Sequence, residues 1–249
     1  PISLWQQVLA DFPFLAHRSH DELARLRELA PEFIFSFYYR QMIPMSVLNL
    51  AKIAPLNMHG SLLPKYRGRV PINWAVLHGE TETGATLHVM AEKPDAGDIV
   101  AQQAVSIGPD DTAGDVFAHV TTAAANTLKG VLPQLLKGDV PRRPNNLAEG
   151  SYFGGRKPED GRIHWEQTAQ QVYNLIRAVA PPYPGAFTDV TTANGTERIT
   201  INAARRLEGT FDRAPGIYRT GSKVIGVCGD KMAVELTEFT PTTFDPTTL

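Results

Sequence analysis

The chain has 249 residues, 43% of them apolar and 20% charged, and its formal net charge is −2. These proportions are typical of a globular protein, and no apolar run reaches the roughly 20 residues of a membrane helix. The weak negative charge argues against a nucleic acid as the main partner, because nucleic-acid-binding proteins usually present a strongly basic face. The single cysteine, Cys228, ends the apolar run VIGVC over 224–228, so we expect it to be a buried strand residue. A lone thiol cannot form an internal disulfide, and we therefore expect a cytoplasmic protein.

Helices and strands alternate in the first part of the chain. Short helices are predicted over 3–11 and 19–29, the second one capped by Ser19 with Glu22 three positions on. Beyond them we predict a strand over 33–39, a helix over 44–51, a strand over 54–58, a loop over 60–71, a helix over 71–78, strands over 86–90 and 99–105, and a helix over 112–137. This alternation favours an α/β fold with a doubly wound, mostly parallel sheet.

The pattern changes near residue 155, where a polar, turn-prone stretch begins. One more helix is predicted over 168–178, and five short strands are predicted over 186–190, 198–203, 216–219, 224–228 and 233–237. Short strands at this spacing suit a small open barrel or sandwich. We therefore predict two domains, residues 1–158 and residues 159–249.

The densest group of reactive side chains lies where an apolar strand runs into a loop rich in Gly, Pro and basic residues, LNMHGSLLPKYRGR over 56–69. Asn57 and His59 are two residues apart, so on a strand they share one face. Ligands of open α/β sheets bind at the carboxyl ends of the strands. An isolated Asn-x-His also fits a solvated strand end, so this spacing alone does not distinguish a ligand-binding site from an exposed strand end.

Asp95 lies in a predicted turn between two strands, in the sequence KPDAGD over 93–98. A tight turn alone could explain the residue, because Asp and Gly favour turns. As a partner of His59, its carboxylate would instead orient the imidazole and favour the protonated ring. An amide, an imidazole and a carboxylate together suit acyl transfer to an amine, which needs a proton acceptor and donors for the developing oxyanion.

The sequence NMHGSLLP over 57–64, with DAG over 95–97, resembles the folate-dependent formyltransferase family. The resemblance implies a Rossmann-like formyltransferase domain followed by an OB-like β-barrel domain. It also implies a catalytic trio in which His59 is the acid/base residue and Asn57 and Asp95 stabilise the transition state. The implied cosubstrate is 10-formyltetrahydrofolate. Its implied contacts are Gln41, Met42, Ile43, Arg69, Ala91, Glu92, Lys93, Pro94 and Asp95.

Plainer roles stay open for several of these residues. Met42 and Ile43 also fit simple core packing, and Arg69 also fits a solvated loop charge. Near Lys65 and Arg67, however, Arg69 suits the anionic groups of a nucleotide sugar or of the folate tail. His88, like His78, flanks the same region, but a lone histidine is more often structural.

Aromatic and basic segments outside the trio resemble the branch of the family that formylates nucleotide-linked amino sugars. They lie at 35–40, 65–69, 73–74, 79–84 and 184–187. This resemblance implies a UDP-amino sugar as the acceptor, with no nucleic acid, no metal and no membrane insertion. Methionyl-tRNA formyltransferases, other sugar N-formyltransferases and formyl-folate hydrolases share the trio and remain alternatives, as does a binding module that has lost catalysis.

The resemblance also concerns the ends of the chain. The first strand, first helix and second strand of the family would precede Pro1, so we expect the natural chain to carry them. The first strand is central in a doubly wound sheet, and its loss would leave backbone groups unpaired. A homo-oligomer and a fusion to a decarboxylase domain both stay open.

Overall fold

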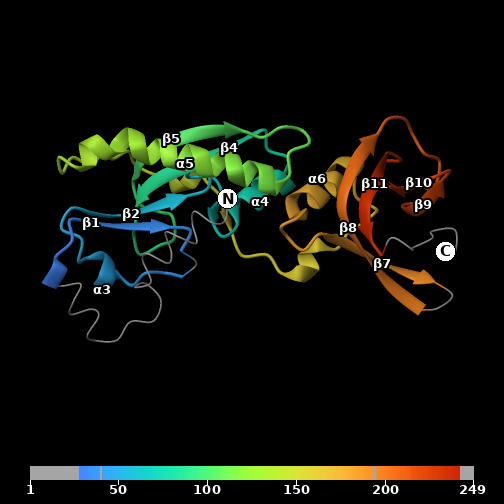
Figure 1. The fold of residues 1–249 in the computed structure, drawn as a ribbon, viewed down its shortest axis with the longest axis horizontal. Helices are drawn as coiled ribbons and strands as arrows, with labels where there is room; N and C mark the ends of the chain where they lie inside the picture. The colour runs from blue at the N-terminus through green and yellow to red at the C-terminus, as the bar shows by residue number, and fades with distance from the viewer. Residues whose placement is uncertain (1–27, 40, 193–194, 242–249) are drawn as a thin grey trace. The chain divides into compact units, whose positions relative to one another are not determined.

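The computed structural model describes residues 28–39, 41–192 and 195–241 (Figure 1). The helix predicted over 3–11 and nearly all of the helix predicted over 19–29 lie outside the described residues. The chain divides into two compact units that are interleaved along the sequence. Unit 1 comprises Pro1–Arg67, Gly84–Ala104 and Ala118–Tyr152, and unit 2 comprises Gly68–Thr83, Val105–Phe117 and Phe153–Leu249.

A four-stranded sheet, most of it in unit 1, carries the motif segments. Its order is β1-β2-β4-β5, with β1 at Phe33–Phe37, β2 at Ala54–His59, β4 at Glu82–Val89 and β5 at Ile99–Ser106. β1 runs parallel to β2, whereas β4 runs antiparallel to β2. The predicted α/β fold is confirmed, and its described sheet is mixed rather than mostly parallel because β4 enters in the opposite direction. Mixed sheets of this kind are common in α/β folds.

β4 begins four residues earlier than predicted, and Gly84 explains the difference. A glycine within a polar segment argues against a strand by propensity. Here, however, a Cβ at Gly84 would lie 2.3 Å from the backbone oxygen of Gln103 and 2.6 Å from the Leu62 side chain. The glycine therefore permits a close approach of neighbouring backbone rather than a break in the strand.

The helices and short elements agree with the predicted positions to within a few residues. They are α3 at Met45–Leu48, α4 at Pro71–Leu77, α5 at Ala113–Leu135 and α6 at Ala169–Val179, with 3₁₀ turns η2 at Leu147–Glu149 and η3 at Pro158–Gly161. The predicted loop over 60–71 contains the two-residue strand β3, Arg67–Gly68, which pairs with β6, Tyr152–Phe153. In unit 1, the buried side chains of Leu56, Met58 and Leu87 anchor β2 and β4 in the core.

A five-stranded antiparallel sheet lies in unit 2 and confirms the predicted OB-like architecture. Its order is β7-β8-β11-β10-β9, with β7 at Ala186–Thr192, β8 at Gly195–Leu207, β9 at Gly216–Thr220, β10 at Lys223–Val227 and β11 at Ala233–Thr240. The sheet curls beside α6 (Figure 1). Thr168 caps α6 in a capping box with Gln171, and Val172 and Ile176 of the helix join Ile199 of β8 in one buried cluster.

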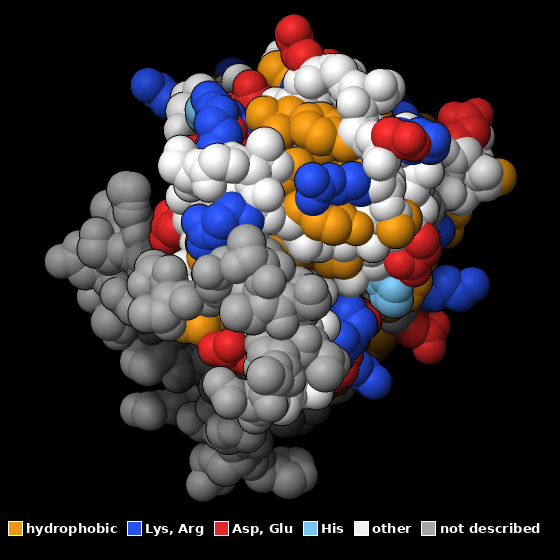
Figure 2. Space-filling view, turned by 90° about the vertical axis from the view of Figure 1, so that its right-hand side faces the viewer, with side chains coloured by type: hydrophobic (Ala, Val, Ile, Leu, Met, Phe, Trp, Pro, Cys, Tyr) orange, Lys and Arg blue, Asp and Glu red, His pale blue; other side chains and the backbone are white. Residues whose placement is uncertain are grey.

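β8 and β11 are both longer than predicted. The prediction ended β8 at residue 203, before two arginines that interrupt the apolar alternation. In the structure Arg205 donates to Glu235 at 2.8 Å and Arg206 donates to Gln170 at 2.8 Å. Because each guanidinium has a polar partner beside the strand, the charges do not end it. The face of the molecule in Figure 2 shows the same mixture, with apolar side chains interspersed with both signs of charge.

Cys228 lies directly after β10 with 1% of its surface exposed, as expected for a structural residue. Burial, followed by the nearby charge of Asp230, raises the pKa of its thiol to about 12. Since the thiolate is the reactive form, this side chain is chemically inert at neutral pH.

Gly226 of β10 gives a stability prediction. A Cβ there would lie 2.0 Å from the indole ring of Trp165, whose Nε1 donates to Thr188 at 3.2 Å. Gly226→Ala is therefore expected to lower the free energy of unfolding by about 1–3 kcal/mol through overpacking. Gly130→Ala in α5 meets no atom within 4 Å and should instead stabilise the protein by about 0.5–1 kcal/mol. Chemical denaturation of both variants checks this contrast, and equal stabilities would contradict it.

Candidate active site

β2 and β4 bring polar side chains together in unit 1. Asn57 and His59 are two residues apart on β2 and so lie on the same face of the sheet. The antiparallel register places His88 of β4 opposite Asn57, and Thr86 opposite His59. The Asn57 amide nitrogen lies 3.1 Å from Nε2 of His88. The rings of His59 and His88 meet edge to face, with their centroids 6.4 Å apart.

Asp95 completes the group from the turn between β4 and β5. Its Oδ1 lies 3.5 Å from Nδ1 of His59 and 3.4 Å from Nε2 of His88, and its side chain is only 12% exposed. The residue has a left-handed φ of 48°, a conformation that Asp tolerates better than most residues. The structure thus brings together the three side chains that the motif proposed, Asn57, His59 and Asp95.

Asn145 fixes this turn and was not anticipated from the sequence. Its side-chain amide donates to the backbone oxygens of Asp95 at 3.0 Å and Gly97 at 3.2 Å. Gly97 lets the turn lie against β4, because a Cβ there would stand 2.0 Å from the backbone oxygen of Val89. A contact spanning 50 residues leaves no local signal, so only the structure reveals it.

His59 has a defined tautomer. It is buried, with 6% of its surface exposed, and its Nε2 lies 2.8 Å from the backbone oxygen of Tyr66. A carbonyl oxygen only accepts hydrogen bonds, so Nε2 carries a hydrogen and donates it. In the neutral ring Nδ1 therefore holds the lone pair, on the side facing Asp95.

The surroundings of His59 lower its pKa below the usual 6.5. Burial is the largest cause, whereas the charge of Asp95 and the hydrogen bond to Tyr66 raise the pKa. A lowered pKa leaves the imidazole neutral at physiological pH, which is the state that a general base requires.

The pH dependence of activity follows from this shift. If neutral His59 accepts a proton, kcat/KM rises with pH through the pKa of His59 and levels off above it. The acid limb should then have its midpoint below pH 6.5, in the direction of the shift. Steady-state rates measured between acid and neutral pH check this. An acid limb centred above pH 7 would contradict it.

The predicted folate contacts fall in three segments. Gln41 and Met42 are exposed after β1, and the 57% exposure of Met42 rules out the core-packing alternative for this residue, while Ile43 is half-buried. The stretch 91–94 forms the turn that ends at Asp95, with both of its charged side chains exposed. Arg69 belongs to unit 2, where it is exposed and its backbone N–H donates to the oxygen of Phe153 at 2.9 Å.

The two flanking histidines differ. His78 lies in unit 2, where it contacts the rings of Trp74 and Phe153 at centroid distances of 5.6 and 5.1 Å. That aromatic packing agrees with the structural role expected for a lone histidine. His88 is 1% exposed and contacts both Asn57 and Asp95. In the sequence, His88 is marked only as a polar residue between two apolar ones, Leu87 and Val89, in the strand that precedes the Asp95 turn.

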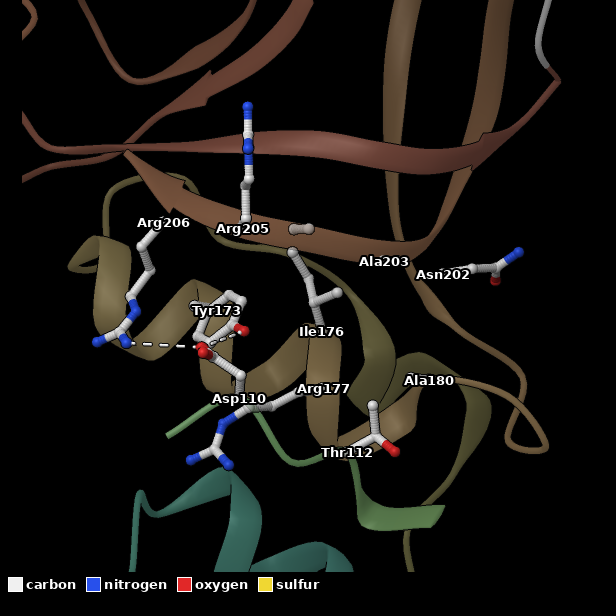
Figure 3. A pocket seen from close by; sticks show the side chains of 11 residues that line it. Asp110, Thr112, Tyr173, Ile176, Arg177, Ala180, Asn202, Ala203, Arg205 and Arg206 are labelled. Carbon is white, nitrogen blue, oxygen red and sulfur yellow. Dashed lines mark hydrogen bonds and ion pairs between the residues drawn. The ribbon is translucent and has the colours of Figure 1, made fainter. Parts of the chain in front are cut away.

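Unit 2 contains a separate cavity of about 470 Å³ beside α6 and β8 (Figure 3). Within it the Tyr173 hydroxyl donates to Asp110 at 2.9 Å, and burial and this carboxylate raise the pKa of Tyr173 to about 12. Arg177 donates to Asn174 at 3.0 Å, and Arg205 points away from the cavity (Figure 3). Because its polar groups largely pair with one another, we interpret this network as structural.

No helix among the described residues combines the length and apolar character needed to cross a bilayer. In the same part of the chain, no three His, Cys, Asp or Glu side chains gather as metal ligands would.

Two family models match the chain. The model for formyl transferase matches residues 12–132, and the model for the formyl transferase C-terminal domain matches residues 156–246. Together they cover most of the sequence, including all members of the trio.

Several solved structures share the fold. HypX from Aquifex aeolicus in complex with tetrahydrofolic acid is 23% identical with a TM-score of 0.66, and the match covers 88% of this chain but only 37% of HypX. An N-formyltransferase from Helicobacter canadensis in complex with folinic acid and dTDP-3-aminofucose is 20% identical with a TM-score of 0.67, covering 81% of this chain and 72% of the other. A 4-N formyltransferase from Francisella tularensis is 23% identical with a TM-score of 0.66, covering 80% and 82%.

Proposed function

Because the chain belongs to the formyl transferase family, we propose that its trio transfers a formyl group from 10-formyltetrahydrofolate to the 4-amino group of UDP-4-amino-4-deoxy-L-arabinose. This reaction would serve lipid A modification and polymyxin resistance. The observation that carries the proposal is that Oδ1 of Asp95 lies 3.5 Å from Nδ1 of His59. His59 and Asn57 both belong to β2.

The chemistry follows from the roles of the three side chains. The sugar amine attacks the formyl carbon, and its proton passes to Nδ1 of His59, the nitrogen left free by the bond to Tyr66. The Asn57 amide donates to the oxyanion that forms on the formyl oxygen. Asp95 stabilises the imidazolium while it exists. The carbon–nitrogen bond to tetrahydrofolate then breaks, and the proton passes from His59 to the departing nitrogen.

The folate contacts are proposed on the same basis. The turn over 91–95 and the segment 41–43 would hold the carrier, mainly through backbone groups. Arg69 would pair with an anionic group of the folate tail or of the nucleotide sugar. Folate binding is supported by the family and by HypX and the Helicobacter canadensis enzyme, whose structures hold folates.

The acceptor is the finer part of the proposal. The Helicobacter canadensis structure contains dTDP-3-aminofucose, and the Francisella tularensis protein is described as a 4-N formyltransferase. The first of these supports an amino sugar as the substrate class, and the second supports a nitrogen at position 4 as the acceptor atom. The UDP-linked pentose rests on the segments that resemble the sugar branch of the family, among them 65–69 and 79–84. The single cysteine suits a reducing compartment, so we place the reaction in the cytoplasm, with catalysis in residues 1–158 and an OB-like domain over 159–249.

One assay separates the candidate acceptors. The full natural chain is given 10-formyltetrahydrofolate with UDP-4-amino-4-deoxy-L-arabinose, with a second nucleotide-linked amino sugar, with initiator Met-tRNA, or with water alone. We expect rapid release of tetrahydrofolate only with the UDP-linked amino sugar. Turnover with the tRNA alone, or equal turnover without any acceptor, would refute the proposal and favour a tRNA formyltransferase or a hydrolase.

A further inference from the structure

His88 is a buried side chain that the reaction described above does not use. Only 1% of its surface is exposed, and it lies opposite Asn57 in the pairing of β2 with β4. Both of its ring nitrogens have close polar neighbours. Nδ1 lies 2.9 Å from the backbone oxygen of Val89, and Nε2 lies 3.1 Å from the amide nitrogen of Asn57.

These two contacts define which nitrogen of His88 carries the hydrogen. The Val89 carbonyl can only accept, so Nδ1 must be the donor. In the neutral ring Nε2 is then an acceptor, and its partner must donate. The Asn57 amide nitrogen meets that requirement, whereas its amide oxygen would not.

The consequence lies in the orientation of the Asn57 amide. Without a partner, an asparagine amide can turn over and exchange its nitrogen for its oxygen. The acceptor on His88 favours the arrangement in which the nitrogen faces β4. Among the described residues this is the one hydrogen bond of the Asn57 side chain, so the second hydrogen of its NH₂ group remains available to a ligand.

We propose that His88 is a positioning residue that holds the Asn57 amide with its nitrogen toward the reacting formyl oxygen. The inference rests on the proposed function, because it assigns the amide of Asn57 to the oxyanion. His88 acts through Asn57 and does not itself touch the substrate. Asp95 lies 3.4 Å from the same nitrogen, and it would compete for that nitrogen only if the ring carried hydrogens on both nitrogens.

Two amide variants separate positioning from packing. Gln places an amide oxygen at the distance of Nε2 from the backbone, so His88→Gln retains an acceptor for Asn57. Asn reaches only as far as Nδ1, so His88→Asn retains the contact with Val89 and loses the one with Asn57. Both variants remain polar and smaller than histidine, and their thermal unfolding midpoints are measured alongside the kinetics.

We expect His88→Asn to lower kcat by about 10- to 100-fold, since small displacements of a catalytic group have effects of this size. The KM for 10-formyltetrahydrofolate should stay within about twofold, because the lost interaction acts only in the transition state. His88→Gln should restore kcat to within about fivefold of wild type. Adding His88→Asn to Asn57→Ala should reduce kcat no further, because both changes remove one function. Equal impairment of the two His88 variants, or full additivity with Asn57→Ala, would overturn the proposal.

A spectroscopic measurement tests the geometry without any assay. The ¹⁵N shifts of the histidine rings, assigned by the loss of a signal in His88→Asn, should show His88 with its hydrogen on Nδ1. A hydrogen on Nε2, or on both nitrogens, at neutral pH would refute the positioning role even if the enzyme is active. If wild type instead shows this tautomer but transfers no formyl group, the proposed function fails and with it the role of Asn57 that His88 supports.

Discussion

His59→Ala is expected to lower kcat by about 10²- to 10⁴-fold, the range that general acid–base groups contribute. The imidazole is buried, its Nε2 is held by Tyr66 and its Nδ1 faces Asp95, so alanine removes the proton acceptor and leaves no replacement. Folate binding should change little, because the ring acts on the amine rather than on the pterin. Single-turnover rates and a folate binding titration separate the two effects.

His119→Ala is the matched control for this variant, since His119 is exposed on α5. It should retain the wild-type kcat. Near-wild-type turnover of His59→Ala, with the control equally active, would remove His59 from the mechanism. Comparable losses in both variants would show that the assay reports on folding instead.

Asn57→Ala is expected to lower kcat by about 10²- to 10³-fold, the typical effect of removing one oxyanion donor. The KM for either substrate should change less than kcat, because the donor acts mainly in the transition state. Asn57→Asp should be at least as impaired, since it places a carboxylate where the oxyanion would form. Steady-state kinetics of the two variants check this order.

Asn146→Asp makes the same change of amide to carboxylate at an exposed residue of unit 1. It should leave kcat unchanged and so controls for the added charge. An Asn57→Asp enzyme more active than Asn57→Ala would contradict the oxyanion role, because a carboxylate cannot donate to a negative oxygen.

The sequence singled out the group of side chains that the structure brings together, because this grouping is encoded locally. Asn57 and His59 stand two apart on a strand, and Asp95 follows Pro94 in a turn whose residues suit that conformation. Strand alternation and turn chemistry act over a few residues and can be recognised without a structure. The same reasoning located nearly all helices and strands of the described part, and the five strands of the OB-like sheet.

The features that the sequence did not predict depend on distant partners. Gly84 fits inside β4 because the backbone oxygen of Gln103 lies where a side chain would stand. Asn145 donates to the backbone of the Asp95 turn from 50 residues away in the sequence. The contact of His88 with Asn57 depends on the register of β4 on β2. Propensity treats a glycine as a strand breaker, and the tertiary contacts at Gly84 override that assignment.

Transfer of an isotopic label tests the central claim most directly. The full natural chain is mixed with 10-[¹³C]formyltetrahydrofolate and UDP-4-amino-4-deoxy-L-arabinose, and the products are analysed by NMR and mass spectrometry. The account predicts a ¹³C-formamide on the 4-amino group of the sugar, formed in equal amount to tetrahydrofolate and abolished in His59→Ala. Label released as free formate, with an unmodified amino sugar, would contradict it.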